Sequence, residues 1–214
     1  MTLVQSPPAN PESRVVLENV SWAFYERMLT EIGNGPTRLT FDNGRLEIMS
    51  PSRLHERVKN ILGRIVEAYG EAMDIVVEAG GSMTFRREDL QKGLEPDECY
   101  YVAHAADILQ KDEIDLSVDP PPDLVIEVDI SRPLVERQPI YAAMGVPEVW
   151  TCVGAQVVPL HLVGGEYQSA RQSLAFANLP MGVVNQIVLL AVTESQSAAM
   201  KSFRNWLQSH RKPT

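Results

Sequence analysis

Three carboxylates lie within one apolar stretch of the sequence, residues 121–130. An apolar run of this length beside prolines predicts a buried strand. Side chains alternate along a strand, so Asp123, Glu127 and Asp129 share one face and aliphatic side chains share the other. A buried carboxylate costs several kcal/mol unless a cation or a hydrogen-bond network compensates it. One face of this strand is therefore core, and the other is a candidate for chemistry.

The distance between strand positions selects the residue that can act together with Glu127. Asp123 and Glu127 are four residues apart on one extended strand, about 13 Å at roughly 3.3 Å per residue, which is too far to share one cation. Asp97 lies on the preceding predicted strand, residues 93–102. Neighbouring strands are about 4.8 Å apart, so Asp97 and Glu127 can converge if their strands pair. Such a pair suits Mg²⁺, which takes few carboxylates and keeps several waters.

Ordinary structural roles also explain these acidic residues. Asp97 could cap a turn, and Glu127 could form a buried ion pair with an arginine. Asp129 could be a third metal ligand, or it could mark the end of the strand where the chain emerges into water. The residues alone leave these alternatives open.

The elements that position these residues follow from periodicity and turn residues. Asn43-Gly44 favours a hairpin between strands at residues 38–42 and 45–49. An apolar stripe predicts a helix over residues 53–69, with His55 at the border of the stripe. Other predicted helices cover residues 20–29, 104–109, the later part of 134–144, and 197–209, and other strands cover residues 74–78, 82–86, 148–153 and 157–163.

Length and composition are typical of one ordinary folded domain. The chain has 214 residues, of which 44% are hydrophobic and 22% are charged. Residues 1–13 are rich in Pro, Ser and Asn and are expected to form a flexible arm, with a single domain over residues 14–214. The net charge of −9 argues against binding of nucleic acid by bulk electrostatics, so any such contact would be local or assisted by a metal.

Cysteine usage and the apolar runs favour a soluble, cytoplasmic protein with no membrane contact. Cys99 and Cys152 each lie in an apolar segment without the close spacing of zinc sites, and we expect reduced core thiols. The first 14 residues have no basic region followed by an apolar one, and the late apolar run at residues 187–192 is too short to cross a bilayer.

Four motifs carry a resemblance to a known family. They are Met49-Ser50-Pro51 followed by His55, and residues 93–97, 122–128 and 141–150. The order of helix, hairpin, Pro-Asp strand, Glu-x-Asp strand, helix and strand resembles the PD-(D/E)XK nuclease superfamily, and more narrowly the Uma-two family of endonuclease-like proteins. The resemblance covers about residues 18–207.

This resemblance implies an α/β fold with a restriction-endonuclease-like core. A central mixed β-sheet would be flanked by helices, with an N-terminal β-hairpin and a C-terminal amphipathic helix. The implied activity is that of an endonuclease that hydrolyses DNA phosphodiester bonds with Mg²⁺ or Mn²⁺ as cofactor. DNA would be its substrate, and we expect a homodimer.

The resemblance also implies roles for individual residues. Asp97 and Glu127 would ligate the metal, and the backbone carbonyl of Val128 could supply a further oxygen. The metal would polarise the phosphate and activate a water for in-line attack. His55 would either hydrogen-bond near the metal or pack at the edge of its helix.

The lysine that usually completes such a site is missing. Asp129 stands at its usual position, and Arg137 stands four residues before Tyr141, where the family often has its lysine. Arginine can stabilise phosphate charge but is a poor proton acceptor, because it stays protonated. Arg137 could therefore replace the lysine, or it could be solvated or paired with Glu136. The alternative function is a catalytically impaired nuclease fold that acts as a binding or regulatory module.

Overall fold

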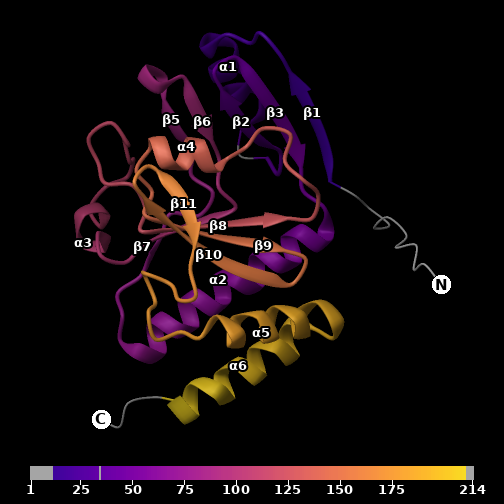
Figure 1. Ribbon diagram of the computed structural model, residues 1–214, viewed down its shortest axis with the longest axis vertical. Coiled ribbons are helices and arrows are strands. Elements are labelled where there is room, and N and C mark those ends of the chain that lie inside the picture. The colour runs from indigo at the N-terminus through magenta and orange to yellow at the C-terminus, as the bar shows by residue number, and fades with distance from the viewer. Residues whose placement is uncertain (1–11, 34, 211–214) are drawn as a thin grey trace, which may run out of the picture.

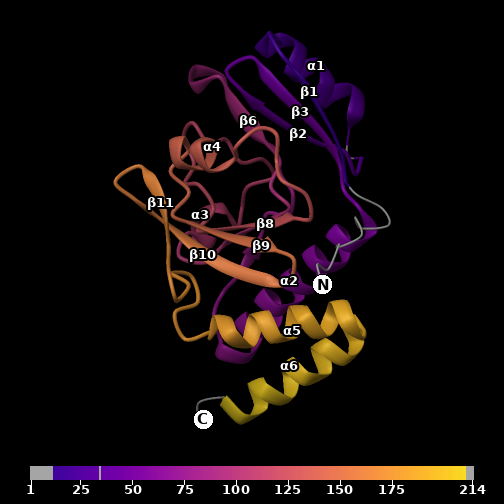
Figure 2. The same cartoon turned by 45° about the vertical axis from the view of Figure 1, so that its right-hand side comes forward.

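Two β-sheets are formed by the residues that the computed structural model describes, 12–33 and 35–210 (Figure 1). One sheet is antiparallel and belongs mostly to the N-terminal half, and the other is mixed and contains the acidic strand. Figure 2, turned by 45°, shows the same arrangement, with the two C-terminal helices on the side of the mixed sheet that is away from the N-terminal sheet.

The antiparallel sheet contains the predicted hairpin. Its strands in spatial order are β1 (Ser13–Leu17), β3 (Arg45–Ser50), β2 (Arg38–Asp42), β6 (Lys92–Leu94) and β5 (Phe85–Arg87). The hairpin turn at Asn43 and Gly44 has positive φ angles of 48° and 87°, as the sequence predicts. Helix α1 (Trp22–Ile32) covers one face through an aromatic cluster that includes Trp22, Tyr25 and Phe41.

The mixed sheet places the acidic strand near its centre. Its strands in spatial order are β11 (Glu166–Ser169), β10 (Gln156–Val163), β9 (Glu148–Val153), β8 (Leu124–Asp129), β7 (Glu98–Tyr101) and β4 (Glu78–Ala79). β8 runs parallel to β9 and antiparallel to β7. Its aliphatic side chains Leu124, Ile126 and Val128 lie in the main core with helix α2 (Arg53–Met73). The acidic face of β8 is therefore the one turned away from α2.

Helices cover both faces of the mixed sheet. The helices α5 (Met181–Thr193) and α6 (Gln196–His210) pack against α2 in one layer (Figure 1). On the other face, α4 (Gln138–Ala143) packs with Val125 of β8 and with Phe85 of the antiparallel sheet. The remaining elements are α3 (Ala105–Ile108) and the short 3₁₀ turn at Glu88–Leu90. None of the helices in the described ranges is long and apolar enough to cross a membrane.

Two strand predictions are wrong for identifiable reasons. The single strand predicted over residues 93–102 is two strands, β6 and β7, which belong to different sheets. Pro96 separates them, because proline cannot donate a hydrogen bond to a sheet ladder. The strand predicted over residues 74–78 is also wrong: α2 continues to Met73, Asp74 ends it in the left-handed conformation, and only Glu78–Ala79 forms a strand.

The expected N-terminal arm needs a correction at its end. Residues 1–11 of that arm lie outside the described residues. Glu12 is buried, and Ser13 begins β1 by pairing with Ser50. These two residues are therefore part of the folded structure, because β1 completes the edge of the antiparallel sheet beside β3.

Candidate active site

The acidic end of β8 meets the antiparallel sheet, and the sequence-predicted site residues lie at this junction. β7 pairs with β8 so that Glu98 lies opposite Ile126. Asp97, one residue before β7, therefore reaches the level of Glu127. The predicted convergence of Asp97 and Glu127 is present, and both residues are almost fully buried, with 2% and 3% of their surface exposed.

Asp97 is held by a side chain and by the backbone of β8. Its Oδ1 lies 2.8 Å from Nε2 of His55, and its Oδ2 accepts a hydrogen bond of 2.7 Å from the Val128 N–H. Burial alone would raise the pKa of Asp97, but the hydrogen bond and the charge of His55, with the charge of Arg137, lower it below its ordinary value. Asp97 is consequently an ionised carboxylate in a buried place.

His55 is placed by the start of α2. The hydroxyl of Ser52 caps the helix by accepting a hydrogen bond from the His55 N–H, which fixes the first turn. The imidazole lies between two carboxylates, with Nδ1 2.5 Å from Oε1 of Glu12. Burial acts to lower the pKa of His55, but hydrogen bonds to Asp97 and Glu12 raise it to about 9. His55 is therefore a buried imidazolium at neutral pH, and it is not a residue that merely packs at the helix edge.

Glu127 contacts two side chains from the segment that follows β8. Arg137 donates to its Oε2 through Nη1, and the Tyr141 hydroxyl donates to its Oε1. Burial raises the pKa of Glu127 to about 7, an effect that Arg137 opposes and that Asp97 and Asp129 strengthen. The buried ion pair between Glu127 and an arginine, one of the alternatives from the sequence, is thus present.

Arg137 lies directly before α4 and points toward Glu127. The alternatives of a solvated arginine and of a pair with Glu136 are wrong, because Arg137 is buried and Glu136 pairs with Arg132 at 3.4 Å. Arg137 therefore lies beside Glu127, where the resemblance leads one to expect a positively charged side chain in place of the lysine.

A family model described as "Uma2: Putative restriction endonuclease" matches residues 22–192, which is most of the chain. The chain belongs to the Uma2 family. The resemblance to this family read from the motifs is confirmed, and so is the expected α/β fold with a mixed β-sheet flanked by helices. No curated protein matches the chain. A similar solved structure is a crystal structure described as "a putative nuclease belonging to DUF820" from Anabaena variabilis, with 13% identity, a TM-score of 0.48, and coverage of 70% of this chain and 90% of that one.

Asp129, where the resemblance leads one to expect a lysine, lies between two guanidinium groups. Its Oδ1 is 3.9 Å from Nη2 of Arg14 and 3.9 Å from Nη1 of Arg137, and this buried oxygen accepts no hydrogen bond from the described residues. Burial raises the pKa of Asp129. The Asp129 side chain is 20% exposed, so it is more accessible to solvent than the carboxylates of Asp97 and Glu127.

Asp123 serves the structure of the neighbouring loop. Its Oδ2 accepts hydrogen bonds from the N–H groups of Val102 and His104, at 2.7 and 3.0 Å, and its Oδ1 lies 2.6 Å from Nδ1 of His104. Asp123 does not reach Glu127, in agreement with the strand-spacing argument.

Two residues of the site, Glu12 and Arg14, were not expected from the sequence, and Glu47 joins them in the structure. Arg14 lies in β1, Glu12 directly precedes that strand, and Glu47 lies in β3. Arg14 donates to both Glu12 and Glu47, and Glu12 bonds to His55. Burial raises the pKa of Glu12, but His55, Ser131 and Arg14 outweigh it and lower the pKa to about 2. No motif or periodicity marks these residues, because they enter the site only through strand pairing.

The chemistry of this cluster fits one divalent cation. Five carboxylates (Glu12, Glu47, Asp97, Glu127 and Asp129) face three cations (Arg14, His55 and Arg137), so two negative charges remain when all are ionised. No described residue donates a hydrogen bond to the buried Oδ1 of Asp129, and carboxylate oxygens that accept one bond retain lone pairs. No ready-made group of three His, Cys, Asp or Glu ligands occurs in the described ranges. A cation would therefore keep several waters, as Mg²⁺ does.

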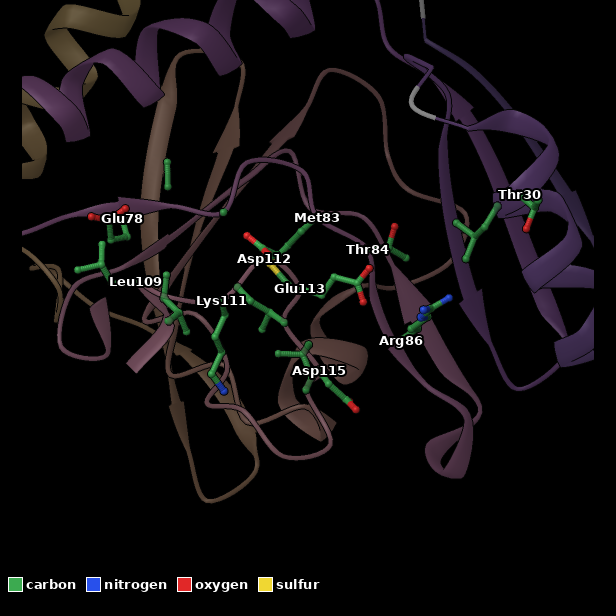
Figure 3. A pocket seen from close by; sticks show the side chains of 16 residues that line it. Thr30, Glu78, Met83, Thr84, Arg86, Leu109, Lys111, Asp112, Glu113 and Asp115 are labelled. Atoms are coloured by element: carbon green, nitrogen blue, oxygen red, sulfur yellow. The ribbon is translucent and has the colours of Figure 1, made fainter. Parts of the chain in front are cut away.

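A separate cavity of about 820 Å³ lies away from these residues (Figure 3). Side chains around it include Thr30 of α1, Glu78 of β4, Arg86 of β5 and the acidic Asp112 and Glu113. None of the clustered carboxylates, arginines or His55 lines it. This cavity is therefore not part of the candidate active site, which is the buried charged cluster.

Proposed function

We propose that the protein is a metal-dependent endonuclease that hydrolyses DNA phosphodiester bonds. One observation carries this proposal: in a chain of the Uma2 family, the buried carboxylates of Asp97 and Glu127 lie at one level of the mixed sheet, beside the guanidinium of Arg137. Two carboxylates can hold a catalytic metal ion, and a neighbouring fixed cation can stabilise the charge that develops on a phosphate during hydrolysis.

Asp97 and Glu127 would hold Mg²⁺ or Mn²⁺, and the Val128 carbonyl is the candidate for a further oxygen ligand. When bound, the cation would supply charge stabilisation at the phosphate and a water of lowered pKa. Asp97 is suited to this role because its pKa is already lowered, so that it is ionised at neutral pH.

The protein's own side chains would fix the charge pattern around the phosphate. Arg137 remains protonated, so it would stabilise negative charge on the phosphate without acting as a proton acceptor. His55 would orient Asp97 through the bond to Oδ1, and the Tyr141 hydroxyl would orient Glu127. Asp129 would leave the site without the usual lysine, so we expect slow hydrolysis in comparison with a site that contains one.

A catalytically impaired binding or regulatory module is the second candidate. It is favoured by the occupation of both Glu127 oxygens by Arg137 and Tyr141, and by the acid at the lysine position. The net charge of −9 also disfavours a broad nucleic-acid surface.

Cleavage assays with a matched pair of variants separate these candidates. Purified protein is incubated with supercoiled plasmid and with oligonucleotides in Mg²⁺, Mn²⁺ or chelator, beside Asp97→Asn and the exposed control Asp107→Asn. The endonuclease predicts metal-dependent nicking that Asp97→Asn abolishes and Asp107→Asn retains. Nicking that survives Asp97→Asn would exclude the site, and no nicking in any metal would favour the binding module.

A further inference from the structure

The N-terminal strand enters the candidate active site from outside the part of the chain that the family model matches. That match begins at residue 22, whereas Arg14 lies in β1 and Glu12 directly precedes this strand. β1 is held along β3, with Arg14 opposite Met49. Both side chains turn into the charged cluster, where they are almost fully buried.

Glu12 connects two parts of the site that are far apart in sequence. Its Oε1 lies 2.5 Å from Nδ1 of His55, whose other nitrogen binds Asp97. Its Oε2 accepts hydrogen bonds from the Ser131 N–H and hydroxyl, at 3.1 and 2.7 Å. One carboxylate thus links the His55–Asp97 pair to the segment that follows β8.

Arg14 holds the same segment with its whole guanidinium group. Its Nε donates to the Ser131 hydroxyl at 3.0 Å and its Nη2 to the Ser131 carbonyl at 3.4 Å. Its Nη1 donates to Glu47, whose Oε2 accepts the N–H groups of Leu134 and Val135 at 2.5 and 2.8 Å. Hydrogen bonds with an ionised partner are the strong and directional ones.

Residues 131–136 join the strand of Glu127 to Arg137, and they form no helix or strand of their own. Their described anchors include Glu12, Arg14 and Glu47, which come from the antiparallel sheet. The approach of Arg137 to Glu127 therefore depends on a segment that β1 and β3 hold in place.

We propose that Glu12 and Arg14 are positioning residues of the active site. Glu12 orients His55, and through it Asp97, while Glu12 and Arg14 together fix the segment that carries Arg137 to Glu127. The inference rests on the proposed function in one respect, namely that Asp97 and Glu127 are the working carboxylates.

The test compares the full-length wild type with Glu12→Gln, Arg14→Lys and the control Glu31→Gln, whose glutamate is exposed on α1. Two signals are measured without metal: the ¹⁵N resonances of the His55 imidazole, and hydrogen exchange at the amides of Ser131, Leu134 and Val135. We expect Glu12→Gln to move the His55 resonances. Both site variants should speed exchange at these amides by about tenfold or more, the factor for losing one charge-assisted hydrogen bond. Glu31→Gln should change neither.

Binding of Mn²⁺ is then measured by calorimetry on the same proteins. Loss of a residue that orients a ligand typically weakens metal binding about 10–100-fold, and we expect this for Glu12→Gln and Arg14→Lys. Unchanged His55 resonances and amide exchange in both variants, or a change confined to global stability, would overturn the positioning role. If Glu12→Gln does not fold, the exchange and affinity of Arg14→Lys decide.

Failure of the two proposals can be told apart. A wild type that binds no Mn²⁺ contradicts the proposed function, whereas the metal-free resonances and exchange rates still decide the roles of Glu12 and Arg14. A wild type that binds Mn²⁺ with an affinity unchanged in both variants contradicts the positioning inference alone.

Discussion

Asp97 and Glu127 lie at the same level of the mixed sheet and are almost equally buried, yet their neighbours differ. Asp97 is held by the His55 imidazolium and the Val128 N–H, and its pKa is lowered. The pKa of Glu127 is raised to about 7 by burial, in spite of the Arg137 guanidinium. Because burial is shared, the difference comes from the surrounding charges: Glu127 has two acidic neighbours, Asp97 and Asp129.

The two carboxylates therefore depend on different supports. Asp97 belongs to a chain of acid, imidazolium and acid that begins at Glu12. Glu127 depends on one arginine and one hydroxyl, which both come from the segment around α4. Removing either support should have effects that differ in size and in pH dependence.

The largest effect is expected from Arg137→Met. The substitution leaves the Glu127 carboxylate buried without its cation, and breaking a buried ion pair in this way typically costs about 3–5 kcal/mol of folding free energy. Urea unfolding measures it, with Arg132→Met as the control because Arg132 is exposed and its one ion pair with a described residue is that with Glu136. Equal midpoints for the two variants would show that the Glu127–Arg137 pair does not stabilise the fold.

The pH dependence of stability distinguishes the Asp97 support from the Glu127 support. The pKa of His55 is raised from its ordinary 6.5 to about 9, so protonated His55 stabilises the fold fully below pH 6.5, and this contribution is lost as the pH rises through 9. The pKa of Glu127 is raised from its ordinary 4.5 to about 7, so protonated Glu127 stabilises the fold fully below pH 4.5. This contribution is lost as the pH rises from about 4.5 to 7, and it does not change at higher pH.

We therefore expect the free energy of unfolding to fall by roughly 3 kcal/mol between pH 6.5 and 9, at about 1.4 kcal/mol per pKa unit. In His55→Gln this fall should disappear. The loss of stability that Glu127 causes as the pH rises from about 4.5 to 7 should remain. Urea unfolding of both proteins at a series of pH values checks this. A wild-type stability that is flat from pH 6.5 to 9 would contradict the buried imidazolium.

A smaller effect is expected from Tyr141→Phe. The hydroxyl donates to the Glu127 carboxylate, and losing a hydrogen bond to a charged group typically costs about 1.5–3 kcal/mol. Tyr167→Phe is the matched control, because that hydroxyl donates to the neutral carbonyl of Val146, where about 1 kcal/mol is typical. If Tyr167→Phe destabilises the protein as much as Tyr141→Phe, the account of Glu127 as a charged acceptor is wrong.

The strand spacing was enough to predict which carboxylates meet. The alternation along β8 and the distance between strands pointed to Asp97 and Glu127 and separated Asp123 from them. The sequence left open whether Arg137 joins the site or is solvated, and its contact with Glu127 decides between them. Whether these residues ligate a metal stays a prediction.

Other parts of the fold could not be predicted from local patterns. Glu12 enters the site because β1 pairs with β3, which begins only at Arg45, and strand pairing between such distant segments leaves no periodic signal. Helix α5 was missed because apolar residues occur on all of its sides, so that no stripe marks it. The switch of sheets at Pro96 divides what reads as one continuous strand.

The central claim is that Asp97 and Glu127 hold one divalent cation between them. A crystal grown with Mn²⁺ and examined by anomalous diffraction tests it directly. The account predicts one anomalous peak, about 2.1 Å from a carboxylate oxygen of each residue, with several waters as further ligands. An absent peak, in crystals that contain Mn²⁺ at other positions and keep Arg137 on Glu127, would contradict the claim.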